Sequence, residues 1–137
     1  MTKSKLHILI VEDQADIRQL IRFPLEPEGY RITEASDAEE ALARREPPDA
    51  VVLDVLMPGG MSGLSLCRIF RSEDIFSKIA IILLSARAQS ADISAGMDAG
   101  AYAYLTKPFS PIELIKVLAQ ALQDAVRTEQ GCESPER

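Results

Sequence analysis

Short apolar runs alternate with amphipathic segments along the whole chain of 137 residues. Apolar runs rich in β-branched residues are typical of strands that are buried on both faces of a sheet. The sequence predicts strands at Leu6–Val11, Tyr30–Glu34, Ala50–Leu53, Ile79–Leu84 and Ala101–Leu105. Because a helical pattern follows each run, we expect an α/β fold with a doubly wound, five-stranded parallel sheet in a three-layer sandwich.

The helical segments are limited by caps and by helix breakers. In the first segment, apolar residues recur at Ile17, Leu20 and Ile21. We expect this helix to stop early, because Pro24 and Pro27 cannot occupy a regular helix interior. The later helices are predicted after a capping box at Asp37–Glu40, at Leu64–Phe70, at Ala91–Ala99 before Gly100, and after the capping sequence Ser110–Glu113.

Composition indicates one globular domain, placed at residues 5–126, followed by a polar tail at residues 127–137. Hydrophobic residues make up 47% of the chain, enough for a sizeable core, and the net charge of −6 argues against nucleic acid or an acidic membrane as partner. There is no signal-peptide pattern and no run that could span a membrane. Cys67 and Cys132 lack metal-ligand spacing, so we expect two free thiols in a cytoplasmic protein.

The chemistry-bearing residues fall where predicted strands end. Glu12 and Asp13 follow the first strand and Asp54 ends the third. Ser85 ends the fourth, and Lys107 follows the fifth. In parallel α/β sheets these carboxyl ends meet at one edge, where ligands bind. Three carboxylates in contact repel one another by about 4 kcal/mol for each pair, and a hard divalent cation such as Mg²⁺ relieves that repulsion.

A cation, an ammonium and a hydroxyl at one edge suit a phosphoryl group. The sequence has no nucleotide-binding glycine loop, so the phosphoryl acceptor would be a side chain, and Asp54 is the candidate. Taken singly, each residue has a structural explanation. Glu12 and Asp13 could favour a helix N-terminus, Asp54 could cap a turn, and Lys107 and Ser85 could be ordinary surface or strand-end residues. Their coincidence at the ends of different strands favours a site.

Four segments carry a family resemblance: VEDQ at Val11–Gln14, LDVLMP at Leu53–Pro58, LLSA at Leu83–Ala86 and YLTKPFSPIEL at Tyr104–Leu114. Together they resemble the receiver domain of bacterial two-component response regulators over residues 5 to 125. The resemblance implies a flavodoxin-like fold with strand order 2-1-3-4-5. It also implies a protein that catalyses only its own phosphotransfer and dephosphorylation.

The resemblance makes Asp54 the acceptor of a phosphoryl group from a sensor histidine kinase or a histidine phosphotransfer protein. The implied metal is Mg²⁺, for which Mn²⁺ can substitute. Its ligands would be the carboxylates of Asp13 and Asp54 and the backbone carbonyl of Leu56. Glu12 would act through a water on the metal.

The remaining roles concern phosphoryl binding and switching. Lys107 would pair with the phosphoryl oxygens, and the Lys107–Pro108 bond is expected to be cis. Ser85 takes the place of the switch hydroxyl, and Tyr104 that of the aromatic whose rotation reports the switch. Phosphorylation would then bias an equilibrium between two conformations and so control an effector domain or a partner.

Some positions depart from the family pattern. The Pro58–Gly63 loop is one residue longer than usual, and two prolines stand in the first helix, which often carries the kinase-docking surface. Tyr102–Ala103 replaces two acids that support a charge-paired dimer in many DNA-binding members, so the protein could be a monomer or a phosphorylation-dependent dimer. Leu56 and Arg87 flank the site, and Leu56 offers no group to orient a water, which predicts slow self-dephosphorylation.

Three other functions are consistent with this fold class. A flavin mononucleotide binder would need a phosphate loop after the first strand, where Glu12 and Asp13 are electrostatically unfavourable. A phosphatase of the haloacid dehalogenase type would need a second aspartate at the position of Leu56. The remaining alternative is a receiver-like docking module that works without phosphorylation, and the complete set of site residues argues against it.

Overall fold

The computed structural model describes residues 6–44, 46–56, 61–87 and 89–131. Within these ranges the strands form one parallel five-stranded sheet in the order β2-β1-β3-β4-β5. The strands are β1 (His7–Val11), β2 (Arg31–Ala35), β3 (Ala50–Asp54), β4 (Ala80–Ser85) and β5 (Ala103–Thr106). The predicted fold class and strand order are confirmed.

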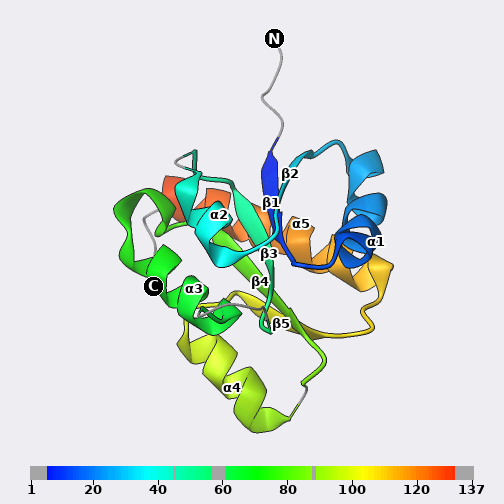
Figure 1. Ribbon diagram of the computed structural model, residues 1–137. Helices are drawn as coiled ribbons and strands as arrows, with labels where there is room; N and C mark the ends of the chain where they lie inside the picture. Colours follow the sequence, from blue (N-terminus) through cyan, green and yellow to red (C-terminus); the bar gives the residue numbers. More distant parts are fainter. Residues whose placement is uncertain (1–5, 45, 57–60, 88, 132–137) are drawn as a thin grey trace.

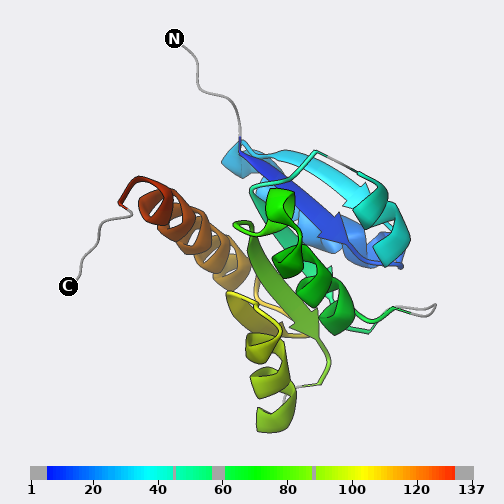
Figure 2. The same ribbon diagram turned by 90° about the vertical axis from the view of Figure 1, so that its left-hand side faces the viewer.

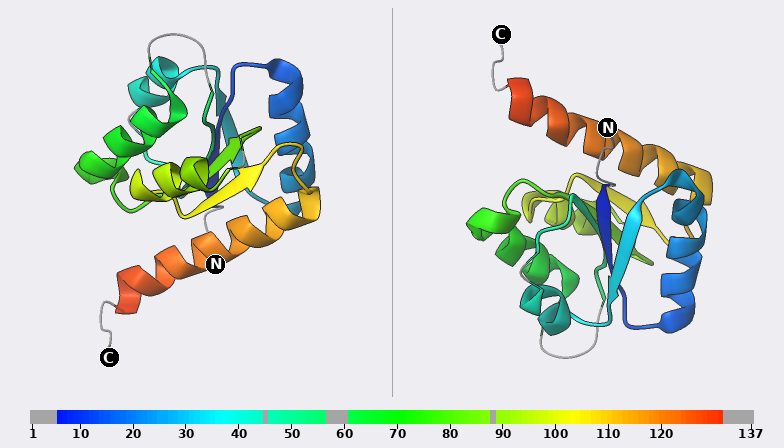
Figure 3. Two further views of the ribbon diagram at one scale, coloured as in Figure 1. Left: turned by 90° about the horizontal axis from the view of Figure 1, so that it is seen from below. Right: turned by 90° about the horizontal axis from the view of Figure 1, so that it is seen from above.

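Helices cover both faces of this sheet, which makes three layers (Figures 1 and 3). They are α1 (Ala15–Leu25), α2 (Ala38–Ala43), α3 (Gly63–Ser72), α4 (Ser90–Asp98) and α5 (Pro111–Gly131), with short 3₁₀ turns at Glu26–Glu28 and Asp74–Phe76. Helices α1 and α5 lie on one face, and Figure 2 looks toward the other face, which α2, α3 and α4 cover. No helix in the described ranges is long and apolar enough to cross a bilayer.

The core consists of two apolar clusters, one on each face of the sheet. On β1, Leu9 and Val11 belong to the cluster under α2, α3 and α4, whereas Ile8 and Ile10 belong to the cluster under α1 and α5. This division follows from the period of two in strand side chains. Strands β1, β3 and β4 are buried along their whole length, and the edge strands β2 and β5 are partly exposed. The near-continuous apolar runs therefore belong to the central strands.

The predicted early end of the first helix was wrong. Pro24 lies inside α1, which continues to Leu25. Pro24 removes the hydrogen bond that its N–H would have donated to the carbonyl of Leu20, and α1 ends one residue later. The backbone of α5 is helical to Gly131, and the polar tail at residues 127–137 stays a prediction. The amphipathic pattern of the helix ends before its backbone does.

The predicted capping box at α2 is only half correct. Asp37 is the N-cap, and its Oδ1 accepts a hydrogen bond of 2.8 Å from the backbone N–H of Glu40. The Glu40 carboxylate does not close the box on Asp37, but accepts from the backbone N–H and the hydroxyl of Ser36 at 2.8 and 2.9 Å. This contact fixes the loop at the carboxyl end of β2. At α5, the predicted cap is present, because the N–H of Glu113 donates to Ser110 Oγ at 3.2 Å.

The sheet register brings the strand ends to a common edge. Val11 pairs with Leu53 and Asp54 pairs with Leu84, so the residues that follow β1 lie beside the end of β3. The end of β5 lies beside the end of β4, since Thr106 pairs with Ser85. Four chain segments that are far apart in sequence therefore converge at the carboxyl edge.

Candidate functional site

Three carboxylates meet at the carboxyl edge of the sheet. Glu12 and Asp13 follow β1 directly, and Asp54 is the last residue of β3. Their ligand oxygens all lie within 4.8 Å of one another. Glu12 is 1% exposed and Asp54 is 5% exposed, whereas Asp13 is open to solvent. The predicted acidic cluster is therefore present, and two of its members are buried.

Lys107 supplies a positive charge to the two buried acids. Its Nζ lies 3.1 Å from Glu12 Oε1 and 3.2 Å from Asp54 Oδ1. The backbone N–H of Lys107 donates to the carbonyl of Ser85 at 2.8 Å, which ties the chain after β5 to the end of β4. The Lys107–Pro108 bond is cis, as predicted. One ammonium thus serves two carboxylates, with a third beside them.

The pKa shifts follow from this shortage of positive charge. Burial raises the pKa of Asp54, against the opposing charge and hydrogen bond of Lys107. Burial also raises the pKa of Glu12, and the neighbouring Asp54 charge adds to this effect, while Lys107 opposes it. Burial alone would lower the pKa of Lys107, but its contacts with Glu12 and Asp54 outweigh burial and raise it. A further cation would stabilise the ionised form of both acids.

The acids and Lys107 border a cavity of about 400 Å³, which Gln14, Leu56 and Ala86 complete. The three clustered groups that could hold a metal are all carboxylates. An all-oxygen donor set matches a hard cation of the Mg²⁺ type and lacks the nitrogen and sulfur ligands that zinc and copper prefer. The residues present therefore fit Mg²⁺.

Ser85 and Tyr104 are not directed at the acids. Ser85 is fully buried, and its Oγ accepts a hydrogen bond of 3.0 Å from the backbone N–H of Arg87. The Tyr104 hydroxyl donates to the carbonyl of the same Arg87 at 2.8 Å. The Tyr104 ring packs against Gly96 of α4, where a Cβ would lie only 2.7 Å from ring atom Cδ2. Both predicted switch residues thus hold the peptide groups of one residue in the β4–α4 loop.

The loop after β3 is described only in part. Leu56 is 50% exposed beside the cavity, and its N–H donates to Asp54 Oδ1 at 3.4 Å. The extra residue expected in the Pro58–Gly63 loop cannot be assigned, because residues 57–60 lie outside the described ranges. Gly63 resumes the chain, and its N–H donates to the carbonyl of Val55 at 2.8 Å. A Cβ at Gly63 would collide with the carbonyl oxygen of Asp54, so this position requires glycine.

Sequence reasoning missed Gly63 and Arg18 as neighbours of the site. Arg18 contacts the backbone of both acids that follow β1. The spacing offers a weak signal, since a basic residue one turn into the first helix lies near the preceding loop. Arg18 forms an ion pair with Glu34 of β2. The sequence alone does not reveal this partner, because the pairing depends on the strand order.

Cys67 and His7 lie away from the acidic cluster and have the surroundings of structural residues. Cys67 is a buried free thiol whose Sγ donates to the carbonyl of Ala99 at 3.3 Å, and burial raises its pKa. Cys132 lies outside the described residues. His7 lies at the opposite edge of the sheet from the acids and is 6% exposed, with Nε2 2.8 Å from Thr33 Oγ1. The burial of His7 and the contact of its ring with Thr33 are those of a structural residue.

A doubly wound sheet with an acid-and-lysine cluster at its carboxyl edge, and without a nucleotide loop, defines a phosphoryl-binding class of flavodoxin-like domain. The sequence profile of the response regulator receiver domain matches residues 8–119. The chain therefore belongs to the response regulator receiver domain family, and its function is that of a receiver in two-component signal transduction. Members of this family are not enzymes in the ordinary sense.

Curated relatives include the phosphate regulon transcriptional regulatory protein PhoB of Klebsiella pneumoniae, 42% identical over 110 residues that cover 79% of this chain and 48% of PhoB. The transcriptional regulatory protein CseB of Streptomyces coelicolor is 40% identical over 119 residues, which cover 85% of this chain and 49% of CseB. The chain thus spans about half the length of these relatives.

Solved structures of similar fold include a putative response regulator from Chloroflexus aurantiacus, with a TM-score of 0.83 and 34% identity. That alignment covers 88% of this chain and 99% of the other. The chemotaxis response regulator CheY4 of Vibrio cholerae aligns with a TM-score of 0.79 and 30% identity, over 86% of this chain and 99% of that protein. Both solved chains therefore match this fold over nearly their whole length.

Proposed function

We propose that this receiver accepts a phosphoryl group on Asp54 in a Mg²⁺-dependent reaction. One observation carries the proposal: the buried Asp54 carboxylate borders an open cavity with Lys107 Nζ 3.2 Å away and two further acids beside it. An Asp54 oxygen would attack the phosphorus of a phosphohistidine whose other ring nitrogen carries a proton, the P–N bond would break with its electron pair going to the ring, and the imidazole would leave as the neutral base. Lys107 would bind the phosphoryl oxygens as they approach.

The metal would be held by the carboxylates of Asp13 and Asp54 and by the carbonyl of Leu56. Mn²⁺, which accepts the same oxygen ligands, would substitute for it. Bound Mg²⁺ would offset the charge of the acids and of the incoming phosphoryl group. Glu12 accepts a hydrogen bond from Lys107 and so orients that ammonium toward Asp54. It also contributes negative charge to the site without contacting the phosphoryl group.

The response would begin at Arg87. Its N–H and its carbonyl are bound by Ser85 and Tyr104, respectively. With a phosphoryl group on Asp54, the Ser85 hydroxyl could donate a hydrogen bond to a charged oxygen. That bond would be stronger than the present one, in which Ser85 Oγ accepts from a backbone N–H. When Ser85 turns toward it, the loop loses one of these two contacts, and Tyr104 and α4 can shift with the loop.

A histidine kinase or phosphotransfer protein would dock beside α1 and the start of α5. Leu20, Phe23 and Ile112 are 57%, 74% and 66% exposed, which is unusual for large apolar side chains. Between α1 and the loop after β5 lies a cavity of about 380 Å³, lined mainly by apolar residues including Ile17 and Phe109. Lys107 borders both this cavity and the acid cavity, so a partner docked here would stand next to Asp54.

The output would pass to an effector domain or to a partner protein. The segments that match this chain cover 48% and 49% of the relatives with transcriptional names. A linked effector domain, or a separate partner that reads the β4–α4–β5 region, would receive the signal. The chain would act in the cytoplasm, where histidine kinases present their phosphohistidine, either as a monomer or as a phosphorylation-dependent dimer.

The test is incubation with Mg²⁺ and acetyl phosphate, followed by intact-protein mass spectrometry. The wild-type chain should gain the mass of one phosphoryl group, and Asp54→Ala should gain none. Asp49→Ala, which removes an acid at the other edge of the sheet, should be labelled like the wild type. Labelling of Asp54→Ala at the wild-type rate would refute the assignment, and so would failure of the wild type to bind either a phosphoryl group or beryllofluoride.

A further inference from the structure

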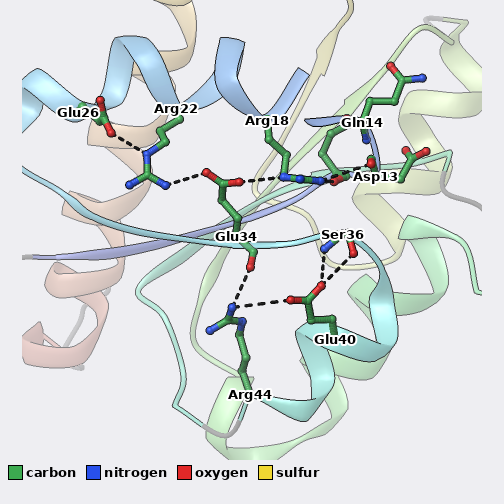
Figure 4. Close-up of polar contacts among 10 residues, drawn as sticks. Asp13, Gln14, Arg18, Arg22, Glu26, Glu34, Ser36, Glu40 and Arg44 are labelled. Carbon is green, nitrogen blue, oxygen red and sulfur yellow. Dashed lines mark hydrogen bonds and ion pairs between the residues drawn. The ribbon is translucent and has the colours of Figure 1, made fainter. Parts of the chain in front are cut away.

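Arg18 connects α1 to the backbone of the two acids that follow β1. Its Nη1 donates to the carbonyl of Glu12 at 2.7 Å and lies 3.4 Å from the carbonyl of Asp13. Figure 4 shows Arg18 reaching toward Asp13 and the start of the loop. The Arg18 side chain is 19% exposed, so the contact with the Glu12 carbonyl is partly buried, whereas the contact with the Asp13 carbonyl is exposed to water. The two carbonyls point toward the guanidinium, while the carboxylates of the same residues belong to the cluster around Asp54.

Glu34 holds Arg18 in place from the neighbouring strand. Arg18 Nε donates to Glu34 Oε1 at 2.8 Å, and Arg22 Nη1 donates to Glu34 Oε2 at 2.7 Å (Figure 4). Burial raises the pKa of Glu34, but the hydrogen bonds and charges of the two arginines outweigh burial and lower it. Glu34 therefore remains ionised, with both oxygens engaged, and Arg22 is also paired with Glu26 at 2.6 Å.

The strand end that carries Glu34 is itself fixed from the other side. Arg44 Nη2 donates to the backbone carbonyl of Glu34 at 2.8 Å. The Glu40 carboxylate accepts from the backbone N–H of Ser36, and its Oε2 lies 4.0 Å from the same Arg44 Nη2 (Figure 4). The chain of contacts from α2 through β2 to Arg18 leaves the guanidinium little freedom. Such a contact chain is typical of the outer groups that orient metal ligands.

We propose that Arg18 is a positioning residue for the magnesium site. By binding the carbonyls of Glu12 and Asp13 while paired with Glu34, it fixes the peptide groups of the β1–α1 loop, and this turns both carboxylates toward Asp54. The inference rests on the proposed function of the site and assigns a role to a residue that contacts neither the metal nor the phosphoryl group. It also makes Glu34, on a strand that supplies no ligand, a support of the site.

Charge and position predict opposite effects for Arg18. A guanidinium near three carboxylates repels an incoming cation, so if its charge alone mattered, Arg18→Gln would bind Mg²⁺ more tightly. If positioning dominates, Arg18→Gln binds Mg²⁺ more weakly, by about tenfold, the usual cost of losing a group that orients metal ligands. Arg18→Lys separates the two further, because it keeps the charge but lacks the planar fork that spans Glu34 and the carbonyls.

The experiment measures the Mg²⁺ dissociation constant by NMR titration of the full chain, at a temperature where each variant is folded. Arg22→Gln is the matched control, because it removes a guanidinium from the same helix and from the same Glu34 carboxylate but touches neither acid carbonyl. Hydrogen exchange of the Gln14 amide, which donates to Glu12 Oε2 at 3.3 Å, reports on the loop in the absence of metal.

We expect weaker Mg²⁺ binding for Arg18→Gln and Arg18→Lys, near wild-type binding for Arg22→Gln, and faster exchange at Gln14 only in the Arg18 variants. Mg²⁺ binding by a folded Arg18→Gln variant that equals or exceeds that of the wild type would overturn the inference. Asp13→Asn separates this result from the proposed function. If Arg18→Gln binds Mg²⁺ as the wild type does while Asp13→Asn does not bind it, only the role of Arg18 fails. If the wild type does not bind Mg²⁺ either, both proposals fail.

Discussion

The two edges of the sheet treat polar side chains differently. At the amino edge, partners are matched: Asp49 Oδ2 accepts from the backbone N–H of His7 at 2.7 Å, and Thr33 Oγ1 lies 2.8 Å from the His7 ring. Arg31 pairs with Glu46 through two contacts of 2.7 and 3.0 Å. Opposite charges and most donor–acceptor pairs therefore balance locally, and His7 Nδ1 is the buried side-chain atom that lacks a hydrogen-bond partner among the described residues.

At the carboxyl edge, charges of one sign accumulate. Glu12, Asp13 and Asp54 converge, and Lys107 is the cation bound to the two buried members. Burial and mutual repulsion make this arrangement costly without a further cation. The contrast shows how a functional site can be recognised within one sheet: the amino edge lowers the free energy of the folded chain, and the carboxyl edge sacrifices some of that stability for binding.

The largest expected effect lies on the amino-edge side. Arg71 of α3 donates to the carbonyls of Gly100, Ser77 and Ile79 at 2.8, 2.9 and 2.6 Å, and so ties together the segments that lead into β4 and β5. Arg71→Ala leaves these carbonyls without their charged donor. We expect a loss of about 3 kcal/mol in the free energy of unfolding, measured by urea denaturation.

The matched control for Arg71 is Arg68→Ala, which removes an exposed arginine from the same helix. It should change stability by less than about 0.5 kcal/mol. A loss below about 1 kcal/mol for Arg71→Ala would contradict the view that the amino edge is a stabilising scaffold. Phosphorylation of folded Arg71→Ala should be retained, since this residue lies away from Asp54.

The fold could be predicted from sequence because the central strands are nearly pure apolar runs. Val51 and Ile81, for example, are fully buried, and their segments had no competing helical interpretation. Strand boundaries were less certain, because turn geometry rather than hydrophobicity sets them: β5 begins at Ala103 instead of Ala101. The strand order itself came from family resemblance, since the alternation of strands and helices alone allows more than one order.

The members of the site could be predicted, but their supports could not. Glu12, Asp13 and Asp54 stand at strand ends, which a linear pattern reveals. The pairing of Arg18 with Glu34 depends on β2 lying beside β1, and no local pattern encodes that neighbour. The present hydrogen bond of Ser85 to the Arg87 N–H was equally unpredictable, because a hydroxyl rotates toward whichever partner the loop offers.

A smaller effect of opposite sign is expected at the carboxyl edge. Asp54→Asn removes one charge from the acidic cluster and relieves its repulsion, at the cost of the contact with Lys107. In metal-free buffer we expect this variant to be more stable than the wild type by about 1 kcal/mol in urea denaturation. Adding Mg²⁺ should stabilise the wild type and have much less effect on the variant.

The same substitution at the other edge sharpens the comparison. Asp49→Asn weakens the hydrogen bond from the His7 N–H and should destabilise the chain by about 1 kcal/mol. The two Asp→Asn changes are chemically identical, so opposite signs can arise only from their surroundings. Destabilisation by both variants in metal-free buffer would show that the carboxyl edge is balanced in charge after all.

The smallest expected effect is a difference in pH dependence. Burial raises the pKa of Asp54 and of Glu12, so the folded chain binds more protons at these groups than the unfolded chain does. Their contribution to stability is present in acid and is lost as pH rises above the ordinary values of 3.8 and 4.5 and through the raised ones. Burial lowers the pKa of His7, and the nearby charge of Arg31 adds to this.

For His7 the unfolded chain binds more protons, so stability rises with pH until the ordinary value of 6.5 is passed. Protonation would place a charge near Nδ1, a buried atom that has no hydrogen-bond partner among the described residues. Urea midpoints of the metal-free chain, measured from about pH 5 to about pH 8, should therefore combine two opposing trends. His7→Gln should remove the rise near neutrality, and Asp54→Asn should weaken the fall from the acidic side. If His7→Gln leaves the profile unchanged, the His7 ring is not held in its neutral form by the amino edge, and the contrast between the two edges rests on the carboxylates alone.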